Sequence, residues 1–362
     1  MADIAEKQAG AGLSRLFTLR RGHNRFDIAD WLTYGFLVLG LLVLFLPVLW
    51  VVLSSFKTNA NLQEFPPTVL PYAMETVDVA GYDRPLTLFN VKTEDGGEKQ
   101  LALIRRVGRI AQMVDPADPE AGKLQVNAAE ITPVKKLHFA VENYSRLLSG
   151  KENTILRYVY NSLFITIVAT IITVVMNSMA AFALSKYRFR GSNLALFGIL
   201  SMLMIPATVI MVPIYLIVSK LGLVGNLWGV ILPTVATPTG VFLLRQYMLT
   251  IPDELIEAAR MDHASEWRIF WRIILPLSTP ALAVVAIFSI LSRWNDFLLP
   301  LLILNKREVY TLQLALTSFQ TQYEIHYDLL LSMTTLTALP LAIVFIFLQR
   351  YITTGIASTG IK

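Results

Sequence analysis

The chain has 362 residues, of which 54% are hydrophobic and only 16% are charged, and its mean hydropathy is +0.55. A water-soluble domain carries roughly 25% charged residues, so this composition excludes an ordinary soluble protein and indicates a chain built for lipid. The absence of cysteine excludes disulfides and thiolate chemistry, and the net charge of +5 lies mostly beside apolar runs, which favours membrane orientation over nucleic-acid binding.

Six apolar runs are long enough to suggest membrane spans. The first, at residues 32–53, is too long for a signal-peptide core and is expected to stay as an anchor. The others cover residues 159–184, 194–218, 228–244, 277–291 and 329–348, each near the ~20 residues that a 30 Å hydrocarbon core requires, although the fifth is short. We therefore expect an all-α membrane protein with six transmembrane helices.

The connection between the first two runs, residues 57–157, differs in composition from the rest of the chain. Alternating stretches at residues 86–91 and 101–104 flank a Glu-Asp-Gly-Gly turn signal at residues 94–97, which predicts a β-hairpin. We expect a small periplasmic insertion of β or α/β structure. A disordered insertion is the alternative, since residues 115–120 have the composition of a loop.

Basic residues of the short loops set the orientation. They follow the second and fourth runs: Lys186, Arg188, Arg190, Arg245, Arg260, Arg268 and Arg272. The positive-inside rule places these loops, and hence both termini, in the cytoplasm. The expected division is a cytoplasmic segment 1–30, a first transmembrane helix 31–56, the insertion 57–157, a core domain 158–350 with five transmembrane helices, and a cytoplasmic tail 351–362.

The connection 251–276 between the fourth and fifth runs predicts two short helices with a break. Pro252 and Asp253 suit the first turn of one helix, and Ser265 suits the start of the next. A small apolar face comes from Leu255, Ala258 and Ala259, and a bulky face towards the membrane interface from Trp267, Phe270, Trp271 and Ile274. A short helix with small residues on one side and charge on the other suits docking into a cytoplasmic partner. An ordinary interfacial helix is the alternative.

The same connection resembles a known sequence family. Glu257-Ala258-Ala259, Asp262 and Ile274-Leu275-Pro276 resemble the EAA loop of ABC importer permeases, and the runs 258–262 and 265–270 resemble the carbohydrate branch, the maltose-type second permease. Shorter similarities lie at residues 54–57, 141–144 and 294–297. The likeness covers nearly all of the chain except the first loop, whose presence resembles α-glucoside permeases.

The resemblance implies a type I ABC importer permease fold and one half of the translocation pathway for a sugar, an oligosaccharide or α-glucoside. It implies a bacterial inner-membrane location and these partners: a second permease subunit in a heterodimer, two ATP-binding subunits, a periplasmic or lipid-anchored solute-binding protein, the sugar and membrane lipid. ATP and Mg would be bound by the ATP-binding subunits, so this chain would hold no cofactor. The implied ATPase-coupling residues are Glu257, Ala258, Ala259, Arg260, Asp262 and His263.

His263 stands where that family usually has glycine, which would permit a positive φ in the break. A tolerated substitution and a pH sensor are the two interpretations. No Gly-x-x-x-x-Gly-Lys-Ser/Thr phosphate loop and no metal-ligand spacing of the four histidines occur in the sequence, so we expect no catalytic and no metal-binding residues.

Polar residues in or beside the apolar runs are candidates for a pore or gate: Asn177, Asn295 and Asp296. For Asn177 the alternative is a bond across a helix interface. An ion-coupled secondary transporter is disfavoured because the runs contain essentially no acidic residue. A membrane scaffold is the third hypothesis, and only the importer predicts a stable complex with a soluble ATPase.

Overall fold

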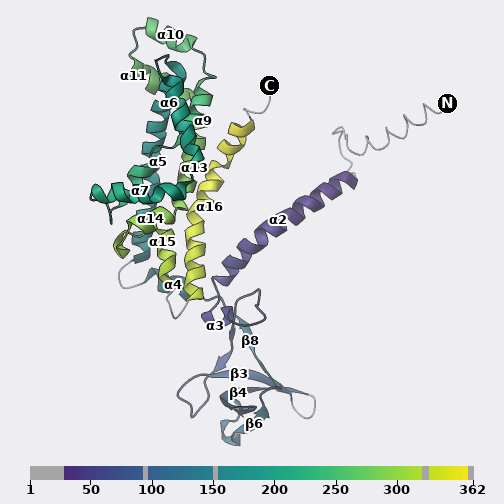
Figure 1. The fold of residues 1–362 in the computed structure, drawn as a ribbon. Helices are drawn as coiled ribbons and strands as arrows, with labels where there is room; N and C mark the ends of the chain where they lie inside the picture. Colours follow the sequence, from purple (N-terminus) through teal and green to yellow (C-terminus); the bar gives the residue numbers. More distant parts are fainter. Residues whose placement is uncertain (1–27, 93–96, 150–153, 320–325, 358–362) are drawn as a thin grey trace, which may run out of the picture. The chain divides into compact units, whose positions relative to one another are not determined.

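The computed structural model describes residues 28–92, 97–149, 154–319 and 326–357. The chain forms two compact units, Met1–Lys57 with Gln63–His138, and Thr58–Leu62 with Phe139–Lys362. The first contains one long helix and all of the strands in the described residues, and the second contains the other long helices (Figure 1). Most of the turn expected at residues 94–97 lies outside the described residues.

The first unit begins with α2 (Ile28–Ser54), which covers the first apolar run and extends beyond it at the amino-terminal side. Its aliphatic and aromatic side chains are exposed along its length, as expected of a helix whose solvent is lipid. The described residues of the unit then form eight strands: β1 (Tyr72–Met74), β2 (Thr76–Val77), β3 (Leu86–Lys92), β4 (Glu98–Val107), β5 (Ile110–Val114), β6 (Leu124–Asn127), β7 (Ile131–Pro133) and β8 (Lys135–Leu137). A short 3₁₀ turn, η1 (Pro119–Ala121), lies between β5 and β6.

The strands form an antiparallel sheet in the order β2-β3-β4-β5-β6, with β7 also paired to β3, and a separate β1-β8 pair. The hairpin expected from the alternating pattern is confirmed as β3 and β4, with Leu88 opposite Ala102. Alternation places Leu86, Leu88 and Val91 in small apolar cores. The insertion is therefore an ordered β-structure in its described residues, and the alternative of a disordered insertion is wrong for them.

The second unit is a helical bundle. It comprises α3 (Asn59–Leu62), α4 (Glu142–Leu148), α5 (Thr154–Lys186), α6 (Ser192–Ser201), η2 (Met202–Met204), α7 (Ala207–Lys220), α8 (Leu227–Ile231), η3 (Leu232–Thr234), α9 (Pro238–Met248), α10 (Glu254–Met261), α11 (Glu266–Ile269), the π-helical η4 (Phe270–Ile274), α12 (Leu275–Leu277), α13 (Thr279–Trp294), α14 (Leu298–Ile303), η5 (Arg307–Val309), α15 (Leu312–Ala315), η6 (Leu316–Phe319) and α16 (Tyr327–Ala357).

The central helix α5 packs against α9 and α13. Its distribution of polar and apolar residues is the reverse of that in a helix of a soluble protein. Most of its buried residues are small or polar, while apolar side chains such as Ile167 and Ile171 are exposed. The small or polar buried residues are Asn161, Ser162, Thr166, Ala169, Thr170, Thr173, Asn177, Ser178 and Ala181, and the large ones are Ile155, Tyr158, Ile165 and Phe182. Small residues let membrane helices approach closely, and polar ones need protein partners because lipid offers none.

Three of the six expected spans are not continuous helices. Helices at Asp30–Ser54, Thr154–Lys186 and Tyr327–Phe347 are each long and apolar enough to cross a membrane, and the described residues give up to six spans if each bent pair counts as one. The pairs at residues 192–220, 227–248 and 266–294 bend by 106°, 43° and 79°. Pro206, Pro238 and Pro280 lie at the start of the second helix of each pair. Proline lacks the N–H that would continue the preceding helix, which explains the breaks.

Within the helical unit, α10 and α11 lie at one end of the bundle and α4 and α15 at the other (Figure 1). The segment expected to dock a partner therefore lies at one end of the bundle, beside the ends of α5, α9 and α13.

Candidate functional site

The short helix α10 is anchored by a single buried residue, Ile256, which is 3% exposed. Ile256 belongs to an apolar cluster with Phe182 of α5, Met248 of α9 and Ile274 of η4. Because this cluster includes residues at the ends of several long helices, a displacement of α10 acts on the bundle through the cluster.

The outer face of α10 is exposed. Glu254, Glu257, Ala258 and Met261 are spaced i, i+3, i+4 and i+7 and form one stripe of the helix, in which Met261 is 80% exposed. Leu255 beside it is 44% exposed. A stripe that combines two carboxylates, a small alanine and exposed apolar side chains has the composition of a surface that another protein covers.

The carboxyl end of α10 is closed by a Schellman motif. The N–H of His263 donates to the carbonyl of Arg260, and that of Ala264 to the carbonyl of Ala259, both at 3.0 Å. In this motif the residue after the cap adopts left-handed backbone, and His263 does so with φ of 56°. Among the described residues it is the one non-glycine residue with positive φ. His263 thus adopts the conformation that glycine would permit at this position.

The second short helix starts as the sequence predicts. The Ser265 hydroxyl accepts a hydrogen bond from the N–H of Arg268 at 3.3 Å, which caps α11. The expected bulky face towards the membrane interface is only half right. Trp267 and Trp271 are exposed, whereas Phe270 and Ile274 are buried in the apolar cluster because η4 turns them onto α5 and α9.

The amino end of α10 is tied to the end of α5 by Lys186. Its ammonium donates to the carbonyl of Ile251 at 2.5 Å and to Asp253 Oδ1 at 2.6 Å. The Lys186 side chain is 3% exposed, while that of Asp253 is 73% exposed. The hydrogen bond from Lys186 lowers the pKa of the Asp253 carboxyl below its ordinary value.

The carboxyl end of α10 is tied to the same segment by Tyr187. Its hydroxyl donates to Glu266 Oε2 at 2.5 Å, and Glu266 Oε1 accepts from Arg260 Nε at 2.8 Å. Hydrogen bonds from Arg260, and then from Tyr187, lower the pKa of Glu266, whereas desolvation and then Glu266 raise the pKa of Tyr187 to about 12. At neutral pH the carboxylate is charged and the phenol is protonated.

The structure brings all six expected coupling residues into this one turn and helix. Glu257, Ala258 and Asp262 are exposed, Ala259 is half-buried against the apolar cluster, Arg260 pairs with Glu266, and His263 forms the turn. Sequence reasoning missed Ile256, Tyr187 and Glu266, and counted Lys186 only as a topology signal. The i, i+3 spacing of Ile256 and Ala259 was the available sign of the buried face of α10.

The candidate pore or gate residues differ in environment. Asn177 is buried in α5, where its Nδ2 donates to Thr237 Oγ1 at 2.6 Å and its Oδ1 accepts from the N–H of Thr237 at 3.2 Å. This geometry is a helix-to-helix bond, the alternative that the sequence left open. Asn295 is exposed, and Asp296 is half-buried and accepts from the N–H of Leu299 at 3.4 Å.

An arginine network joins the same helices. Arg293 of α13 donates to Ser289 Oγ at 2.6 Å, to Thr173 Oγ1 of α5 at 2.7 Å, and to the carbonyl of Thr234 in η3. The hydroxyls of Ser289 and Thr170 are 2.7 Å apart. These hydrogen bonds give the polar groups of Arg293, Thr173 and Thr170 partners on neighbouring helices, which lipid could not supply.

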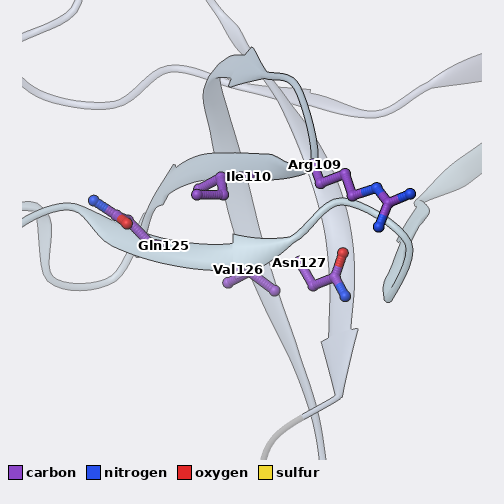
Figure 2. Close-up of a pocket in the computed structure, with 5 residues that line it drawn as sticks. All are labelled: Arg109, Ile110, Gln125, Val126 and Asn127. Atoms are coloured by element: carbon purple, nitrogen blue, oxygen red, sulfur yellow. The ribbon is translucent and has the colours of Figure 1, made fainter.

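No group of three or more His, Cys, Asp or Glu residues with metal-binding geometry occurs among the described residues. The sheet of the first unit has a shallow hollow of about 330 Å³ between its β5 and β6 strands (Figure 2), lined by Arg109, Ile110, Gln125, Val126 and Asn127.

Comparisons with known proteins agree with these features. Residues 174–358 match the family described as binding-protein-dependent transport system inner membrane component. The chain is 41% identical over 202 residues to the arabinooligosaccharides transport system permease protein AraQ of Halalkalibacterium halodurans, covering 56% of this chain and 72% of the relative. It is 30% identical over 227 residues to the diacetylchitobiose uptake system permease protein NgcG of Streptomyces coelicolor, covering 62% of this chain and 74% of the relative.

Among solved structures, a bacterial ABC transporter involved in the import of the acidic polysaccharide alginate superposes with a TM-score of 0.64 and 20% identity. The match covers 91% of this chain and 99% of the other. At this identity the likeness concerns the fold, which is a mostly helical membrane permease with a small sheet inserted after its first helix.

Proposed function

Because the chain belongs to the family of binding-protein-dependent transport system inner membrane components, we propose that it forms one half of the translocation pathway of an oligosaccharide importer and is driven through α10. It is a permease subunit of an ABC importer in the inner membrane and not itself an ATPase. The proposed assembly pairs it with a second permease subunit, two ATP-binding subunits and a solute-binding protein. Both termini are proposed to be cytoplasmic.

The observation that carries the coupling proposal is the combination of an exposed α10 stripe and a buried Ile256. A cleft of the ATP-binding subunit would receive Glu257 and Ala258, and closure on ATP would move α10 as a rigid element against α5 and α9. Charge-assisted hydrogen bonds to Glu257, once desolvated by the partner, contribute about 1.5–3 kcal/mol each.

Replacing Glu257 by lysine tests this contact. We expect Glu257→Lys to abolish co-purification with the ATP-binding subunit and to uncouple uptake, while the protein stays in the membrane. Glu308→Lys is the matched control, because Glu308 is also exposed but lies at the opposite end of the unit, where its carbonyl accepts from Asn161. Normal uptake by Glu257→Lys would exclude the docking role.

The proposed substrate class follows from the relatives, whose names refer to arabinooligosaccharides and diacetylchitobiose. An α-glucoside is the alternative suggested by the insertion. Calorimetry of the cognate binding protein with arabinooligosaccharides, diacetylchitobiose, maltose and trehalose separates them. Binding of none of these, with binding of a non-carbohydrate, would contradict the sugar assignment.

For the pathway, we propose that Asn295 and Asp296 lie at a gate, because they follow α13 at its end remote from α10. Asn177, which makes two hydrogen bonds to Thr237, is proposed to hold α5 against α9 when the pathway changes shape. Substitution of Asn295 by alanine should then change uptake without changing the amount of assembled complex.

For the insertion, we propose a periplasmic position and a role in receiving the loaded binding protein. The β4–β5 hairpin exposes Arg105, Arg106 and Arg109, none of which makes an ion pair within the described residues. An acidic partner surface would be attracted to them, and salt would weaken the attraction.

Charge reversal tests this surface. Arg106→Glu with Arg109→Glu should reduce the stimulation of ATPase activity by the loaded binding protein and reduce its salt dependence, with basal activity unchanged. Arg84→Glu, an exposed arginine of the same unit outside the hairpin, serves as control. Equal stimulation of both variants would reject the hairpin as the contact.

A further inference from the structure

We infer that Lys186 and Tyr187, at the end of α5, are positioning residues of the coupling machinery, which clamp both ends of α10 so that α5 moves with it. This inference rests on the proposed coupling role of α10. Lys186 and Asp253 are 67 residues apart in the sequence, so α5 holds α10 through contacts between distant parts of the chain.

The first clamp holds the amino end of α10. The buried Lys186 ammonium has two acceptors, the Ile251 carbonyl and the Asp253 carboxylate, and both lie in the turn that leads into α10. A buried ammonium requires such partners, since leaving it unpaired in an apolar site is costly. Lys186 therefore fixes where α10 begins relative to α5.

The second clamp holds the carboxyl end. Tyr187 donates to Glu266 at the start of α11, and the other oxygen of Glu266 accepts from Arg260 in the last turn of α10. The carboxylate thus bridges the break at His263 and connects three segments. Removing the Tyr187 hydroxyl would leave the Arg260–Glu266 pair intact but detached from α5.

Three points define the position of a rigid body. Without the clamps, α10 has eight residues and the single buried anchor Ile256, about which it can rotate. The helix is also too short to hold its own geometry in water. With Lys186 and Tyr187 engaged, the same helix is fixed at both ends and in the middle, so a push from a partner reaches α5 without loss through rotation.

The test uses the full complex in proteoliposomes, with both permeases, the ATP-binding subunits and the binding protein, and measures sugar taken up per ATP hydrolysed. We expect Tyr187→Phe and Lys186→Met to lower this ratio about five- to tenfold, the scale of the net contribution of one ordinary hydrogen bond. The ATPase rate and the KM for ATP should stay within about twofold of the unmodified complex. Lys186→Arg, which keeps the charge, should restore most of the ratio.

Matched controls are Tyr247→Phe and Lys220→Met. The Tyr247 hydroxyl and the Lys220 ammonium have no hydrogen-bond partner within the part of the chain that the structure describes. A double variant, Tyr187→Phe with Glu266→Ala, should be no worse than Glu266→Ala alone, since both remove the same contact.

A normal ratio in Tyr187→Phe and Lys186→Met, with Glu257→Lys uncoupled in the same assay, would overturn the clamp and leave the docking proposal standing. Normal transport by Glu257→Lys as well would instead overturn the docking proposal. A parallel fall of ATPase activity and uptake in Tyr187→Phe would show a merely structural role and also overturn the clamp. Tyr187→Phe removes one oxygen atom, so it keeps the test usable if Lys186→Met fails to assemble.

Discussion

The left-handed turn at His263 leads to a prediction that can be checked one amide at a time. A non-glycine residue in this conformation costs about 1–2 kcal/mol, whereas glycine adopts it freely but loses about 0.5–1 kcal/mol more conformational entropy when ordered. His263→Gly should therefore make local opening of the turn less favourable by a net ~0.5–1 kcal/mol, a factor of about two to five.

Hydrogen exchange measures this opening directly. The amide of Ala264 donates to the Ala259 carbonyl and is released only when the turn opens, so its protection should rise two- to fivefold in His263→Gly. In His263→Val protection should fall, since a β-branched residue tolerates positive φ least. Rates are compared with the intrinsic rate for each sequence. The Ile269 amide, bonded to Ser265 in α11, is the internal reference. Unchanged or faster exchange at Ala264 in the glycine variant would refute the strain argument.

Two further predictions concern packing and pH. Gly240→Ala should lower the melting temperature by several degrees, because the added carbon would overlap Asn177 Nδ2. Gly198→Ala is the control and should leave the melting temperature unchanged, since nothing lies within 4 Å of the added carbon. Equal melting temperatures of the two variants would contradict the close packing at Gly240. The Tyr187–Glu266 contact should contribute equally across neutral pH. The pKa of Glu266 is lowered by folding, so the contact contributes fully above pH 4.5 and is lost as the pH falls through the pKa of Glu266 in the folded protein. The pKa of Tyr187 is raised to about 12, so at high pH the contact is lost only as the pH rises towards 12. The difference in sugar-to-ATP ratio between Tyr187→Phe and the unmodified complex should thus be constant from pH 6 to pH 8; a steep change would contradict these shifts.

The sequence predicted those features that follow from local pattern. Apolar runs identify the membrane helices, alternation identifies the β3–β4 hairpin, and Ser265 correctly marks the start of α11. The angles of the bends at Pro206, Pro238 and Pro280 do not follow from the apolar runs. Hydropathy is averaged over a window and is blind to a missing N–H, so a bent pair of helices scores like one span.

The clamps were missed for a different reason. Lys186 and Asp253 are 67 residues apart, and Tyr187 and Glu266 are 79 residues apart, so neither contact leaves a periodic signal in the sequence. Lysine beside an apolar run has an ordinary explanation as a topology signal, which hides a structural role. Only the return of α9 to the end of α5 brings these side chains together.

The position of α5 connects these separate contacts. At one end Lys186 is bonded to the turn that leads into α10, and the following Tyr187 is bonded to Glu266 of α11. At mid-length Thr173 accepts from Arg293 of α13, and Asn177 is bonded to Thr237 ahead of α9. α13 and α9 each belong to a bent helix pair, and the bends at their proline breaks are 79° and 43°. A helix changes direction most easily where a backbone hydrogen bond is already absent. We therefore expect a displacement of α5 to be absorbed at these two breaks, and the buried polar residues of α5, which lipid cannot satisfy, to keep all three segments in contact while they move.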